Sequence, residues 1–109
     1  MIHITFKPET LELTIEGHAG QNKKGADIVC SAISTLFYTL GQALIESEEM
    51  LEEKVTFKDE DGKGYISCKP KKEYIGNIAR SYWTICVGLQ MVAENYKKFV
   101  TMRVVGWQE

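Results

Sequence analysis

Hydrophobic and polar residues alternate near the start of the chain in two short runs. Ile2, Ile4 and Phe6 are separated by polar residues, and the run from Leu11 to Glu16 alternates in the same way. Because successive side chains of a strand point to opposite faces, each run predicts a half-buried strand with one apolar face. The polar segment 7–10 between the runs predicts a turn, and so an antiparallel hairpin.

After residue 27 the apolar residues recur at steps of three and four. This spacing predicts an amphipathic helix that has Asp27 as its N-cap and ends near Glu48. A second helix is expected from about Lys72 to Lys97. The apolar positions are Cys30, Ile33, Phe37, Leu40 and Leu44 in the first helix, and Ile75, Ile78, Ala79, Tyr82, Cys86, Leu89, Ala93 and Tyr96 in the second.

Three further strands complete the pattern. Residues 54–58 and 64–69 alternate on either side of a turn over 59–63, and residues 100–104 alternate again. The expected inward-facing residues are Val55, Phe57, Ile66, Cys68, Val100, Met102 and Val104. The element order is therefore ββαββαβ. An α+β two-layer sandwich, with both helices on one face of a mixed or antiparallel sheet, buries every apolar face, so residues 1–109 are expected to form a single domain.

Composition removes several classes of function. The 109 residues are 44% hydrophobic and carry a net charge of −2 with no basic block, which argues against direct binding to nucleic acid. The N-terminus alternates rather than resembling a signal sequence, and no apolar stretch is expected to reach membrane length. Cysteines at 30, 68 and 86 lack the spacing of a disulfide framework or a zinc site. We expect a cytoplasmic protein with reduced thiols, no metal and no cofactor.

The candidate chemistry lies where the second predicted strand leads into the first helix. His18 follows this strand and Cys30 lies near the start of the helix. A thiolate is favoured near a helix N-terminus and beside a protonated imidazole, so the two side chains fit a cysteine hydrolase. Strand alternation places His18 on the face away from the helices. Gly17 can provide the turn toward Cys30, because glycine accepts backbone angles that other residues resist.

Each of these residues also has a structural interpretation. Cys30 could be a small core residue and His18 a surface residue. Asp27 could cap the helix or orient the imidazole, and capping is the better prediction. Ser34, one turn after Cys30, could donate a hydrogen bond to the sulfur or an oxyanion, or could bond its own helix. The amides of Val29 and Cys30 are candidate donors for an oxyanion hole. His3 is expected to be a solvated bystander, and Cys68 and Cys86 are expected to be packing residues.

The string Gly17-His18-Ala19-Gly20, followed by residues 25–34 (GADIVCSAIS), resembles the ribosomal-processing cysteine protease family called Prp. This resemblance implies a homodimeric protease that removes the N-terminal extension of a bacterial large-subunit ribosomal protein, protein twenty-seven. It implies His18 as the catalytic histidine, Cys30 as the nucleophile, and Asp27 and Ser34 as supporting residues. It also implies a mobile loop between the histidine and the cysteine that admits an extended peptide.

The residues give weak independent support for the last two points. The segment from Gly20 to Gly25, together with Gly17, offers little apolar area to pack, as expected of a loop that becomes ordered over a substrate. Trp83, Val87 and Met91 form an additional apolar line on the second helix, which suits either a dimer contact or the edge of a wide core face. A second class of function stays open, namely a non-catalytic anion-binding or thiol-redox module that assists ribosome assembly.

Overall fold

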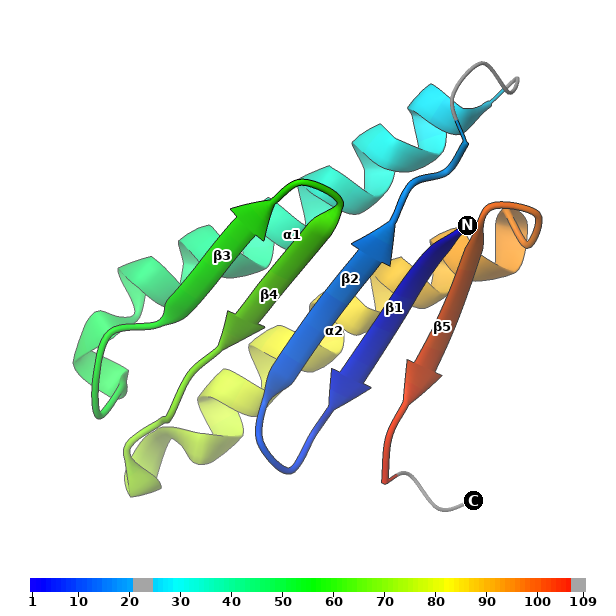
Figure 1. Cartoon of the computed structure of the whole chain (residues 1–109). Coiled ribbons are helices and arrows are strands. Elements are labelled where there is room, and N and C mark those ends of the chain that lie inside the picture. Colours follow the sequence, from blue (N-terminus) through cyan, green and yellow to red (C-terminus); the bar gives the residue numbers. More distant parts are fainter. Residues whose placement is uncertain (21–24, 107–109) are drawn as a thin grey trace.

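The computed structural model describes residues 1–20 and 25–106, and in this part of the chain it confirms the predicted order ββαββαβ (Figure 1). The strands are β1 (Ile2–Lys7), β2 (Glu12–Gly17), β3 (Thr56–Glu60), β4 (Lys63–Ser67) and β5 (Val100–Val104). The long helices are α1 (Ala26–Glu46) and α2 (Ile75–Asn95), and two short 3₁₀ turns, η1 (Glu48–Met50) and η2 (Lys72–Tyr74), lie beside them.

The five strands form one mixed sheet in the order β3-β4-β2-β1-β5. All neighbours are antiparallel except β1 and β5, which run parallel. Both helices lie on the same face of the sheet (Figure 1), so the predicted α+β two-layer sandwich is confirmed. Because β2 pairs with β4 in the antiparallel sense, the end of β2 meets the start of β4, where Glu16 pairs with Lys63.

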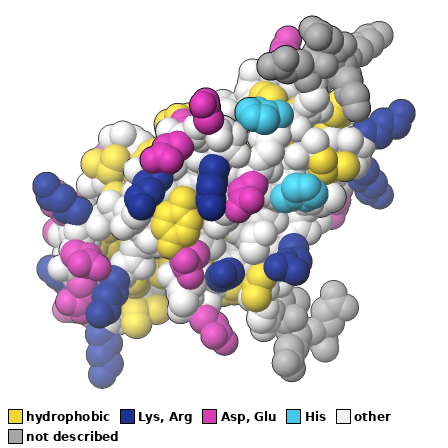
Figure 2. Space-filling view, in the orientation of Figure 1, with side chains coloured by type: hydrophobic (Ala, Val, Ile, Leu, Met, Phe, Trp, Pro, Cys, Tyr) yellow, Lys and Arg dark blue, Asp and Glu magenta, His cyan; other side chains and the backbone are white. Residues whose placement is uncertain are grey.

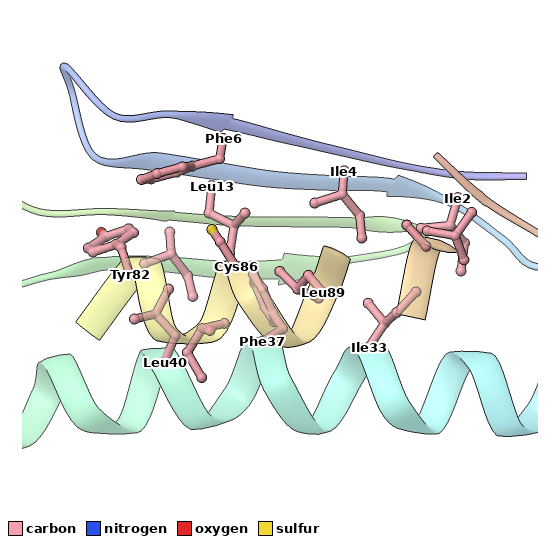
Figure 3. Close-up of a cluster of buried hydrophobic side chains, with 14 of the residues drawn as sticks. Ile2, Ile4, Phe6, Leu13, Ile33, Phe37, Leu40, Tyr82, Cys86 and Leu89 are labelled. Carbon is pink, nitrogen blue, oxygen red and sulfur yellow. The ribbon is translucent and has the colours of Figure 1, made fainter. Parts of the chain in front are cut away.

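The core lies between the sheet and the helices (Figure 3). The alternating residues Ile2, Ile4 and Phe6 of β1 point from the sheet toward the helices, as predicted. Phe6 stacks on Tyr82 of α2 with the ring centroids 5.7 Å apart. Full burial of one large apolar side chain stabilises a fold by about 1.5–3 kcal/mol. Side chains with almost no exposed area come from three strands and both long helices: Ile4, Leu13, Leu40, Leu44, Ile66, Ile78, Tyr82 and Leu89.

The predicted N-cap of α1 is wrong. The helix begins at Ala26, its N-cap is Gly25 with φ +90°, and no side chain bonds to the cap. Asp27 is instead an exposed acidic residue in the first turn. The left-handed backbone at Gly25 ends the loop and starts the helix earlier than expected, so Cys30 is the fifth helical residue and not the third. The helix also ends at Glu46 rather than near Glu48.

Other predicted boundaries shift by a few residues. The second hairpin pairs Glu60 with Lys63, so its turn contains only Asp61 and Gly62 and not the whole predicted segment 59–63. Acidic residues are tolerated here because β3 is an edge strand. The predicted helix 72–97 divides into η2 and α2. On α2, Ile75 is exposed, so its predicted place on the core face is wrong, and Ile85, which was not among the predicted core residues, is buried.

The length of α1 corrects another expectation. In the described part of the chain, this 21-residue helix is apolar enough to cross a membrane by length and composition, although we expected no such stretch. The core helix of a soluble protein meets the same criterion. One side of α1 packs in the core through Val29, Ile33, Phe37, Leu40 and Leu44.

Candidate active site

Gly17 breaks the alternation of β2 just before His18. Its φ is +101°, and a methyl group on its Cα would lie 2.2 Å from the carbonyl oxygen of Met1. Only glycine fits such a position, because other residues rarely adopt this φ and the neighbouring atom is backbone. The predicted turn at Gly17 is therefore present. Beyond it, the carbonyl of His18 accepts a hydrogen bond of 2.7 Å from the amino group of Met1.

An open cavity of about 190 Å³ lies beside this turn, and it brings His18 together with Cys30 and Ser34. Its walls come from the end of β2, the β3–β4 hairpin and the N-terminal half of α1, three segments that approach each other near the upper end of the sheet in Figure 1. The lining residues are Ile2, Ile15, Gly17, His18, Cys30, Ile33, Ser34, Phe37, Tyr38, Asp59, Gly62, Lys63 and Gly64.

Cys30 is the exposed thiol of the chain. We expected it to start the buried stripe of α1, but that stripe begins with Ala26 and Val29, and Cys30 lies beside it, facing solvent. Cys86 is buried, and this burial raises the pKa of its thiol to about 12. Burial also raises the pKa of the half-buried Cys68, to which the Tyr82 hydroxyl donates a hydrogen bond of 3.5 Å. The core positions predicted for Cys68 and Cys86 are confirmed.

Ser34 is exposed one turn after Cys30 and lines the same cavity. Thr35 and Thr39, its neighbours on α1, each donate a hydrogen bond to the carbonyl four residues earlier. Within the described residues, Ser34 makes no such bond, so its hydroxyl is available to the cavity. Asp27, Gly20 and Gly25 are not among the lining residues. The predicted substrate loop includes residues 21–24, which lie outside the described residues.

The backbone amides differ from the expected oxyanion donors. The Val29 amide donates to the carbonyl of Gly25 at 3.2 Å, so it is already used within the helix. Cys30, the fifth helical residue, finds its acceptor in the preceding turn by ordinary helix geometry. The amides without an intrahelical acceptor are those of Ala26, Asp27 and Ile28. The positive end of the helix dipole is therefore one turn before the thiol.

The imidazole of His18 lies against the β3–β4 turn. A methyl group on the Cα of Gly62 would lie 2.7 Å from Nε2 of His18. In the described part of the chain, no hydrogen bond joins His18 to Cys30 or to Asp27. Catalytic hydrogen bonds are often long or poorly aligned before a substrate binds and tighten in the complex, so the shared cavity is compatible with a dyad.

The two histidines have different surroundings. Nδ1 of His3 is 2.8 Å from Oγ1 of Thr101, on the sheet face that no helix covers. Figure 2 shows both histidines, in cyan, at the surface and apart from each other. Only His18 lines the cavity with Cys30, so the interpretation of His3 as a solvated bystander agrees with its position.

The part of the cavity that comes from the β3–β4 hairpin was not predicted from the sequence. Asp59, Gly62 and Gly64 belong to β3, β4 and their turn, and they line the same cavity as Cys30. The hairpin itself was predicted. Its place beside β2 depends on strand order, which local periodicity does not specify.

Comparisons with known proteins identify relatives of this arrangement. The profile of the family described as "Cysteine protease Prp" matches residues 1–101. Among solved structures, the essential ribosomal processing protease Prp from S. aureus with a covalently linked product peptide has a TM-score of 0.74 and 21% identity, over 95% of this chain and 99% of that chain. The same protease with a substrate peptide has a TM-score of 0.69 and 21% identity, over 94% of this chain and 96% of that one.

A third similar structure is SMU.848 from Streptococcus mutans, with a TM-score of 0.68 and 24% identity, over 94% of this chain and 90% of that chain. At these identities the structural likeness establishes a shared fold. A comparison with curated proteins gave no match. Because the family profile covers residues 1–101 of 109, the chain belongs to the cysteine protease Prp family.

Proposed function

We propose that this protein is a cysteine endopeptidase that removes the N-terminal extension of a bacterial large-subunit ribosomal protein, protein twenty-seven, during ribosome assembly in the cytoplasm. Membership of the Prp family supports the class of enzyme. The S. aureus relative is described as a ribosomal processing protease and binds a substrate peptide, which supports a peptide substrate for the present chain.

The observation that carries the proposal is the exposure of the Cys30 thiol in the cavity that His18 also lines, while the other two thiols are buried or half-buried. We assign Cys30 as the nucleophile and His18 as the general base. The imidazole accepts the thiol proton, and the sulfur attacks the peptide carbonyl carbon to form a tetrahedral oxyanion. The imidazolium then protonates the leaving amine, and water hydrolyses the remaining thioester to release the acid and the thiol.

Two further residues support this chemistry in the proposal. The Ser34 hydroxyl, which makes no hydrogen bond to its own helix in the described part of the chain, can donate to the sulfur or to the oxyanion from the same cavity. Asp27 has an exposed carboxylate in the first turn of α1. Because Asp27 lies in the part of the sequence that resembles the Prp motif, we assign it the supporting role of orienting the imidazole of His18 when a substrate is bound.

The cavity suits an extended peptide. It is open to solvent and has both aromatic walls, from Phe37 and Tyr38, and a carboxylate, from Asp59. We assign Gly17, Gly20 and Gly25 to the loop that admits the peptide, because Gly17 and Gly25 mark its two ends and all three have positive φ.

We also propose a homodimer formed through α2. Val87 and Met91 are 49% and 59% exposed, although both are apolar. With Trp83, Met102 and Val104 they line an apolar depression of about 210 Å³. A contiguous exposed apolar surface of this kind is typical of a contact between subunits, and a second copy of the chain offers the same surface.

Cleavage of a precursor peptide tests the proposed function. The peptide contains the N-terminal extension and the first residues of protein twenty-seven, and mass spectrometry detects any new N-terminus. We expect one cleavage by the wild type and by Cys68→Ala, and none by Cys30→Ala. If the wild type binds the peptide but leaves it intact, the protein is a binding module of the anion-binding or thiol-redox kind instead.

A further inference from the structure

The β3–β4 turn contacts the imidazole of His18 at a position that has no side chain. A methyl group on the Cα of Gly62 would lie 2.7 Å from Nε2, 3.2 Å from Cε1 and 3.5 Å from Cδ2 of His18. A Cβ atom does not approach a non-bonded heavy atom to 2.7 Å, so a side chain here would force the ring to move. The Nε2 end of the ring therefore occupies the space that a side chain at position 62 would fill.

The backbone joins this turn to the residue before His18. The Gly17 amide donates a hydrogen bond of 2.8 Å to the carbonyl of Gly62, one residue beyond the pairing of Glu16 with Lys63. On the other side, the His18 carbonyl accepts from the amino group of Met1. The main chain is thus held on both sides of His18, and the exposed imidazole lies against the turn at Gly62.

From this contact we infer that Gly62 is a positioning residue for the proposed reaction. Because glycine has no side chain, the His18 imidazole can occupy the space beside position 62, in the wall of the cavity that Cys30 also lines. The inference rests on the proposed function, in which the imidazole must reach the thiol proton. A side chain at position 62 displaces the ring, and a displacement of about 1 Å in a catalytic group reduces turnover by roughly 100-fold.

The first test is Gly62→Ala, with Gly106→Ala as its matched control. Both glycines have a left-handed backbone, with φ +68° and φ +83°, so both alanines introduce similar strain. Of these two methyl groups, only the one at position 62 meets a described residue, because no described residue lies within 4 Å of the one at position 106. We expect Gly62→Ala to lower kcat on the precursor peptide by about 100-fold with KM unchanged, and Gly106→Ala to retain wild-type kcat.

Gly62→Asn separates contact from strain. Asparagine tolerates the left-handed region better than alanine and still has a Cβ atom. We expect it to be as slow as Gly62→Ala, and it remains informative if the alanine variant does not fold. A folded Gly62 variant with wild-type kcat, or an asparagine variant that regains activity, would overturn the positioning role.

Imidazole NMR signals give a readout that is independent of cleavage. The chain has two histidines, so His18→Ala assigns the signals. We expect Gly62→Ala to shift the His18 signals and leave those of His3 in place, whereas Gly106→Ala shifts neither. Unchanged His18 signals in Gly62→Ala would show that the imidazole does not occupy the space beside position 62. Failure of the wild type to cleave would contradict the proposed function. The NMR comparison would still test whether the His18 imidazole occupies the space beside position 62.

Discussion

At the scale of single residues, the three cysteines show how surroundings determine reactivity. The thiolate is the reactive form of cysteine, and burial opposes its formation. Cys86 is 3% exposed, and burial raises its pKa to about 12, whereas Cys30 faces solvent in the cavity. The same sequence pattern predicted apolar positions for both residues, so their difference arises from packing.

We expect iodoacetamide to alkylate Cys30 well before Cys86 at neutral pH in the folded protein. A pKa of about 12 keeps the Cys86 thiol protonated until the pH is far above neutral, and its burial excludes the reagent. Peptide mapping by mass spectrometry at successive times measures both rates, with the denatured protein as a control in which all three cysteines react. Equal rates in the folded protein would contradict the assigned environments.

His18→Ala and His3→Ala form a matched pair. General acid–base catalysis contributes roughly 10²- to 10⁴-fold, so we expect His18→Ala to lower kcat on the precursor peptide by that amount and to affect KM less. His3 bonds to Thr101 away from the cavity, so His3→Ala should keep wild-type kcat. Steady-state kinetics on both variants provide the comparison. Similar losses in the two variants would indicate a general folding effect and remove the case for a dyad.

Part of the site was predictable at this scale. The proximity of His18 and Cys30 along the chain and the turn at Gly17 follow from residue types alone. The contact between His18 and Gly62 does not, because it joins residues that are distant in sequence through the pairing of β2 with β4. The N-cap prediction failed because Asp27 and Gly25 both favour the start of a helix, and the left-handed Gly25 provided it.

At the scale of elements, α1 supports the hairpin that forms the wall of the cavity. A methyl group on Gly41 would lie 2.0 Å from the ring of Phe57 on β3, and Phe57 packs edge-on against Phe37 of α1. The edge strand thus approaches the helix closely at a glycine. This contact holds β3 close against α1.

Gly41→Ala should destabilise the protein even though alanine favours a helix. Overpacking costs about 1–3 kcal/mol, which exceeds the roughly 0.5–1 kcal/mol that alanine gains over glycine in a helix. Gly76 of α2 is the control, because within residues 1–20 and 25–106 no atom lies within 4 Å of a methyl group there, and Gly76→Ala should be neutral or slightly stabilising. Urea unfolding gives both free energies. A Gly41→Ala variant more stable than the wild type would show that Phe57 moves aside freely.

Helices and strands were predictable as elements, and their ends were not. In β1, β2, α1 and α2, one side of each element is buried, and the spacing of apolar residues along the sequence shows this directly. The β3–β4 turn is shorter than predicted because paired backbone on an edge strand accommodates charged side chains at Asp59 and Glu60. Their polar composition predicted a turn, but Asp59 and Glu60 pair with β4 and so belong to the strand.

At the scale of the whole molecule, the sheet has one face covered by helices and one open face. The open face carries polar contacts, such as the hydrogen bond of 2.6 Å from the Tyr65 hydroxyl to Glu12. Exposed apolar residues lie instead on the helices, among them Val87 and Met91 on α2. The layer arrangement followed from the apolar faces, whereas the strand order depends on long-range pairing and could not be derived from them.

Val87→Glu should convert the proposed homodimer to a monomer while keeping the fold. A charge buried in a subunit contact without a partner is strongly unfavourable. Ile45 of α1 is 47% exposed, close to the 49% of Val87, so Ile45→Glu is a control for the introduction of a charge at an exposed apolar position. Sedimentation equilibrium measures the mass of each variant. A dimeric Val87→Glu protein, or a monomeric wild type, would rule out an interface at α2.

The central claim is that the Cys30 sulfur bonds to the peptide during cleavage. Acid quenching of the enzyme during turnover of the precursor peptide, followed by intact-mass measurement and peptide mapping, observes that bond directly. We predict a mass increase equal to the acyl part of the substrate, located on the fragment that contains Cys30 and absent from Cys30→Ala. Undiminished cleavage by Cys30→Ala, or an acyl group on Cys68 or Cys86 instead, would contradict the account.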